Sequence, residues 1–198
     1  MPELDNDDGN NFKQQYELEY GLTDHLQLAY YEVATWNRTD DWQRDSFKLE
    51  GKYRILESGE LPVDLTLYGE YKNPNGHRDA ASDEVELKLI ASKNMGRWNI
   101  TGNFITERAI NEHKPWAFEY TLGARYPITP KLRIGLELTE SLGTTEDLGI
   151  RRKDHKVQIM PIIGFSPTPN TRILFGPAIG LTRASDDLQL KSIVEIDF

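Results

Sequence analysis

Apolar and polar residues alternate along eleven stretches of this 198-residue chain. Between Phe47 and Ile55, Phe, Leu, Gly, Tyr and Ile occupy every second position, and Lys, Glu, Lys and Arg stand between them. Successive side chains of a β-strand point to opposite faces, so a period of two predicts a strand with one apolar and one polar face. The predicted strands span residues 12–22, 26–32, 47–55, 61–72, 84–91, 98–105, 116–126, 132–139, 156–165, 172–181 and 188–198.

Two features within these stretches predict local irregularities. Alternation blurs near Tyr31 and Glu32, which indicates a β-bulge. Pro161 and Pro177 stand inside predicted strands. Because proline cannot donate a hydrogen bond to the ladder, we expect bulges or breaks in pairing at both positions. No segment has a sustained helical period with caps at both ends.

The connections between predicted strands alternate in length. Short segments rich in turn formers lie at 21–24, 58–60, 94–96, 127–130 and 167–170, and longer polar segments lie at 37–44, 73–82, 109–114, 143–154 and 183–187. Short turns on one rim and long loops on the other are the organisation of outer-membrane barrels, whose tilted strands need about 9 to 11 residues to cross the bilayer. The pattern predicts an all-β protein, an antiparallel up-and-down transmembrane β-barrel.

Alternation alone leaves open which face is inside. About twelve strands enclose an interior too wide for one layer of aliphatic side chains to fill. Aromatic residues such as Tyr20, Trp98 and Tyr126 stand near strand ends on the apolar face, where interfacial girdles belong. Charges of both signs nearly balance on the polar face, as a narrow lumen requires. We therefore expect lipid on the apolar face, and we expect the lumen to be lined near mid-depth by Arg54, Glu70, Glu119, Arg125, Arg133 and Glu137.

Composition narrows the function classes. The net charge of −9 argues against nucleic acid as a partner. No run of apolar residues is long enough for a membrane-spanning helix, and a mean hydropathy of −0.60 suits strands that are half polar. The absence of cysteine suits a periplasmic route. The four histidines have no ligand spacing, so neither a metal site nor a cofactor is expected.

The two ends of the chain suggest a fragment. No signal peptide precedes the first predicted strand, and bacterial barrels have even strand numbers with both termini periplasmic. We expect a parent protein of about twelve strands, whose first strand is missing here. Residues 1–11 would then be an acidic tail or the stub of that strand, and residues 12–198 the barrel domain. The alternative is a flexible tail and one miscounted strand.

Short motifs carry a resemblance to known families. Leu190, Val194, Ile196 and terminal Phe198 resemble the C-terminal signature by which the barrel-assembly machinery recognises outer-membrane proteins. The segment 17–28, with Gly-Leu-Thr-Asp at its turn, is similar to outer-membrane channel proteins of the meta-pathway phenol-degradation family, and 126–132 and 165–170 read as variants of that turn. The resemblance implies a channel or transporter and carries no catalytic residues.

We therefore expect a protein of the bacterial outer membrane, in contact with its lipids. It would serve as a passive channel for small solutes or as a structural barrel. One alternative is a soluble or periplasmic lipid-binding barrel with an apolar cavity. Another is a lipid hydrolase at the rim, with Ser141 as nucleophile, His155 as base and Asp154 orienting the histidine. Known lipolytic barrels place Ser two residues after His, where this chain has Val157.

Overall fold

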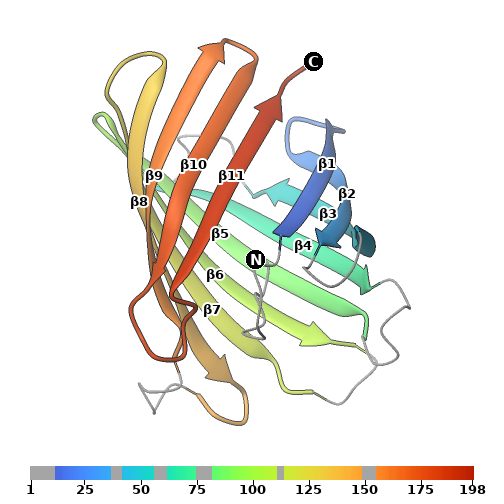
Figure 1. The fold of residues 1–198 in the computed structure, drawn as a ribbon. Coiled ribbons are helices and arrows are strands. Elements are labelled where there is room, and N and C mark those ends of the chain that lie inside the picture. Colours follow the sequence, from blue (N-terminus) through green and yellow to red (C-terminus); the bar gives the residue numbers. More distant parts are fainter. Residues whose placement is uncertain (1–11, 37–41, 56–61, 75–81, 111–113, 149–154) are drawn as a thin grey trace.

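The computed structural model describes residues 12–36, 42–55, 62–74, 82–110, 114–148 and 155–198. All eleven predicted strands are present, and each is antiparallel to the next in chain order within a single sheet (Figure 1). None of the described residues forms a helix long and apolar enough to span a membrane. The strands are β1 Phe12–Gly21, β2 Leu26–Trp36, β3 Gln43–Arg54, β4 Asp64–Pro74, β5 Glu84–Met95, β6 Trp98–Ala109, β7 Ala117–Pro127, β8 Leu132–Thr144, β9 Val157–Thr168, β10 Thr171–Gly180 and β11 Leu188–Ile196.

The bulge expected near Tyr31 and Glu32 lies just beyond them: β2 keeps its register with both neighbours at these two residues and shifts against β3 between Val33 and Ala34. The alternation blurs for a different reason. Tyr31 stands on the polar face, where its hydroxyl donates to Glu50 at 2.7 Å. Glu32 stands on the apolar face, where its carboxylate accepts from Arg44 at 3.0 Å. Two further register shifts occur among the described strands, between β7 and β8 and between β9 and β10.

The two strand prolines interrupt pairing as expected, and they do so together. The register of β9 with β10 runs from Ile173↔Phe165 to Phe175↔Ile163 and resumes only at Ile179↔Ile159. In that register Pro161 and Pro177 stand opposite each other. Neither has an N–H to donate, so this pair of positions forms no ladder bond. Each proline still aligns with its other neighbour, Leu136 of β8 and Leu190 of β11 respectively.

The charged face of the sheet is concave. Lys52 of β3 reaches Glu19 of β1 at 3.0 Å, and Lys13 of β1 reaches Asp45 of β3 at 3.9 Å, so both pairs pass over β2. Two strands that have a third strand between them lie roughly 10 Å apart. Their side chains can meet only where the sheet curls. The opposite face is convex and apolar, with Leu18 and Leu190 exposed by 70% and 69%.

β1 and β11 are the two edges of the sheet, and no pairing between them occurs among the described residues. Figure 1 shows the sheet curled around an open interior, with these two strands at its free edges. Because direction alternates along the sheet, β1 and β11 run the same way. The described architecture is thus an open, barrel-like antiparallel meander.

Candidate functional site: the concave face

The concave face of the first strands is a field of ion pairs. Lys48 of β3 lies 2.9 Å from Glu70 of β4, and their side chains are only 12% and 8% exposed. Lys72 of β4 similarly meets Glu84 of β5 at 2.8 Å. Charges so poorly solvated are tolerated because each finds an opposite charge at hydrogen-bonding distance. This half of the interior is therefore polar, with ion pairs that join neighbouring strands.

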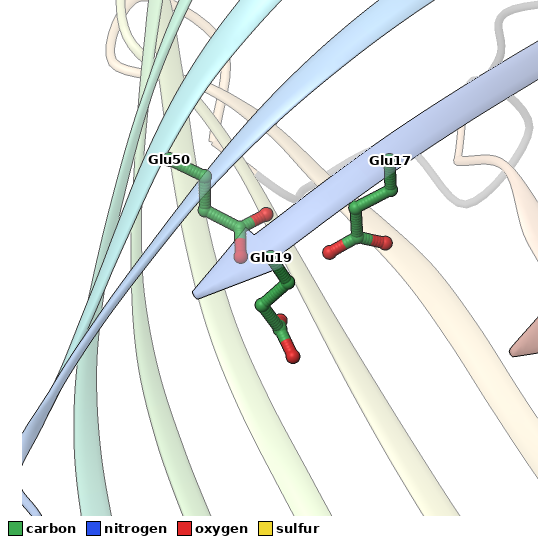
Figure 2. A group of neighbouring side chains, drawn as sticks. All are labelled: Glu17, Glu19 and Glu50. Carbon is green, nitrogen blue, oxygen red and sulfur yellow. The ribbon is translucent and has the colours of Figure 1, made fainter. Parts of the chain in front are cut away.

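Three carboxylates gather at one point of this face, as Figure 2 shows. Glu17 and Glu19 project from β1 and Glu50 from β3, with one carboxylate oxygen of each within 4.8 Å of the others. Glu19 and Glu50 both align with Ala29 of β2, so only a methyl group stands between them. Carboxylate oxygens suit hard cations. Here the ammonium of Lys52 supplies the positive charge, 3.0 Å from Glu19 and 2.6 Å from Glu50.

The sequence did not reveal this carboxylate cluster. Glu17 and Glu19 share a face by their spacing, but their meeting with Glu50 depends on the register of two strand pairs. Ala29 is a small residue on the otherwise bulky polar face of β2. Because a small residue leaves room for large side chains on both neighbouring strands, it was a sign in the sequence that such side chains could meet there.

The six residues predicted to line the lumen lie at different places. Glu70 is paired with Lys48. Half-buried Glu119 aligns with Ile105 of β6 and Ser141 of β8. Arg54 is the last residue of β3 and is exposed, so it lies at a strand end rather than at mid-depth. Arg133 extends over Gly164 of β9. Among the six, the structure brings together only Arg125 and Glu137, 4.0 Å apart.

The concave face of β9 and β10 is apolar. Met160, Ile162 and Ala178 are buried and cluster with Leu174. They alternate with exposed convex residues such as Ile163 and Phe175, so both faces of these strands are apolar. The sequence contained this signal, since β9 and β10 lack the regular charges found elsewhere on the polar face. The interior is therefore divided into an ion-paired part and an apolar part.

The convex face carries a different set of residues at each end of the strands. Toward the longer connections, Tyr71 donates a hydrogen bond to Asp83 at 2.8 Å and Tyr120 donates to Glu140, while Tyr30 near the middle of β2 donates to Glu32 at 2.6 Å. Toward the short turns, the rings of Trp98 and Tyr126 lie 5.0 Å apart, and Arg97 stacks over Tyr126 at 4.7 Å. Mostly aliphatic side chains, with Phe104 and Phe175 among them, cover the convex surface between these two levels.

The hydrolase candidates do not form a catalytic arrangement. Nδ1 of His155 lies 3.5 Å from Glu140. Ser141 follows Glu140 directly on β8, so its side chain points to the opposite face of the sheet. Asp154 lies outside the described residues. A serine and a histidine on opposite faces cannot share the hydrogen bond that activates the nucleophile.

No protein-family model matches this chain, and no curated protein matches it.

Proposed function

We propose that this chain forms the wall of a bacterial outer-membrane β-barrel, a passive channel for small solutes or a structural barrel with an ion-paired lumen. The observation that carries the proposal is the polarity of the sheet. Leu, Ile, Val and aromatic side chains cover the convex face, and the paired charges line the concave one. An exposed apolar surface of this extent requires a nonaqueous partner, and lipid is the partner that surrounds a convex wall on all sides.

The two polar and aromatic levels of the convex face support the same proposal. Tyrosine and tryptophan rings with a polar end favour the boundary between lipid and water. The Tyr71 and Tyr120 pairs with carboxylates would lie at the interface near the longer connections. Trp98, Tyr126 and Arg97 would lie at the interface near the short turns. The aliphatic surface between them would then face hydrocarbon.

A barrel also needs its edges closed. Pairing β1 directly with β11 would join parallel strands in an otherwise antiparallel sheet. A twelfth strand between them would be antiparallel to both and would give the even number that bacterial barrels have. We infer that the working protein has such a strand.

The lumen would conduct poorly. A ring of about twelve strands is narrower than a sixteen-stranded porin, and the ion pairs of β1 to β5 extend into that space. We expect small single-channel conductance or none.

The two alternatives have less support. A soluble lipid-binding barrel would put its aliphatic side chains on the concave face and its charges on the convex one, the reverse of the arrangement in β1 to β5. A rim hydrolase would need Ser141 and His155 on one face.

Neighbouring residues on β5 provide the test. Leu89 and Ile90 are both aliphatic and central in the strand, but they point to the convex and the concave face respectively. The chain has no cysteine, so Leu89→Cys and Ile90→Cys each accept a single fluorescent label. After refolding into phospholipid vesicles, a lipid-borne quencher should act on the label at 89 far more strongly than on that at 90. Equal quenching, or a chain that stays monodisperse without detergent, would contradict the proposal.

A further inference from the structure

The apolar part of the concave face borders a half-open pocket. Its apolar lining includes Met160 and Ile162 of β9, Leu174 of β10 and Ile193 of β11. These strands present their own hydrophobic side chains to the interior, although the convex face already satisfies the need for a lipid-facing surface. Apolar pockets with a few polar groups on one side are the usual form of small-molecule sites.

The polar border of the pocket carries an excess of positive charge. Arg125, Glu137 and Lys191 line it, two cations against one anion. Arg125 and Glu137 approach only to 4.0 Å, at the limit of an ion pair, and the Arg125 side chain is 42% exposed. No ion pair among the described residues involves Lys191. Donors remain available for an additional anion.

From this juxtaposition we infer that the pocket binds small amphipathic organic anions, with the hydrocarbon body on Met160, Ile162 and Leu174 and the anionic group at Arg125 and Lys191. The inference rests on the proposed function, because it places the ligand inside the barrel. The inference adds a substrate class to the proposed function. A neutral or cationic molecule of the same shape would bury its body equally well but would leave the two cations without a partner, so charge decides the selectivity.

Met160 makes the site directly observable. The chain has three methionines, at positions 1, 95 and 160. Met95 ends β5 at the short-turn end and is 59% exposed, so its methyl group reports nonspecific partition of a ligand into detergent. The full chain, refolded in detergent with [methyl-¹³C]methionine, is titrated with hexanoate, hexanol and hexylammonium. Hexanoate should move the Met160 methyl resonance to saturation and leave Met95 in place.

Charge-removing variants separate recognition from partition. Lys191→Gln should weaken hexanoate binding by about tenfold, the loss of one charge-assisted hydrogen bond, and should leave the weak hexanol response unchanged. Lys88→Gln removes a concave-face cation of β5 outside the pocket and should have no effect. Equal responses to the three ligands, or Met160 and Met95 shifts that grow together without saturation, would overturn the inference.

The two proposals fail differently. Equal quenching on the two faces of β5 would contradict the membrane barrel. A saturable, charge-selective response of Met160 would still indicate a binding site. Face-dependent quenching without a saturable Met160 response would contradict the anion site and would still support the barrel.

Discussion

The side chain of Arg133 lies flat across Gly164, its partner on the neighbouring strand: a Cβ built on Gly164 would come within 2.6 Å of Arg133 Cγ. The same Cβ would lie 2.9 Å from Leu174 Cδ2 on the other side. Glycine is therefore required at this position by close packing. With a larger residue at position 164, the Arg133 side chain would have to project into the interior instead of lying along the sheet.

Gly164→Ala should destabilise the folded protein. The added methyl group would push against the stem of Arg133 rather than its flexible end, an overpacking that costs about 1–3 kcal/mol. The measurement is the urea midpoint of unfolding in detergent. Gly51→Ala is the matched control, because the nearest atom to its Cβ, Leu28 Cδ2, is an ordinary 3.6 Å away. Equal midpoints for the two variants would contradict the packing argument.

Strand positions were predictable from the sequence because alternation is a local property. Each stretch such as 47–55 contains its own evidence, and β3 at Gln43–Arg54 includes nearly all of that stretch. The break at Pro161 and Pro177 was predictable for the same reason, since a missing N–H follows from residue type.

Features that depend on register were not predictable. The meeting of Glu17, Glu19 and Glu50 requires knowing that Glu19 and Glu50 share a row with Ala29. Alternation also misled at Tyr31, because a tyrosine counts as apolar until its hydroxyl is known to bond Glu50. Arg54 shows the same limit, since its depth in the wall depends on where β3 ends.

Removing the Lys48–Glu70 pair should widen the lumen. In a Lys48→Ala, Glu70→Ala double variant neither charge is left without its partner, so the fold should persist. Two long side chains would be gone from the interior, and single-channel conductance in planar bilayers should rise above that of the wild type. A Glu32→Ala, Arg44→Ala variant removes a pair from the convex face and should leave conductance unchanged. An effect of equal size in both variants would argue against an interior position for Lys48 and Glu70.

A charge introduced at the centre of β5 should lower the folded fraction only when it lies on the convex face. Leu89→Lys would place an ammonium in hydrocarbon, at a cost of about 2–4 kcal/mol near the bilayer midplane. Ile90→Lys would place it beside Thr66 and Asn103, where polar groups can solvate it. The folded fraction after refolding into vesicles, measured by heat-modifiable gel mobility, should fall for Leu89→Lys alone. If both variants fold equally well, lipid does not contact the convex face at this point.

The stability of the carboxylate cluster should depend on Lys52. The Glu50 side chain is only 3% exposed, and Lys52→Met would leave its carboxylate with the Tyr31 hydroxyl but without a counter-charge, beside Glu17 and Glu19. The loss should be about 1–3 kcal/mol in urea unfolding, the penalty for an unsatisfied buried polar group.

Adding Glu50→Gln to the Lys52→Met variant should recover most of that loss, because a neutral amide needs no counter-charge and can still accept from Tyr31. Lys93→Met, a substitution of the same type at an exposed position near the end of β5, controls for the change of residue alone. The double variant discriminates between two roles of Lys52. If its aliphatic stem matters by packing, the double variant stays as unstable as Lys52→Met; if its charge matters by balancing Glu50, stability returns.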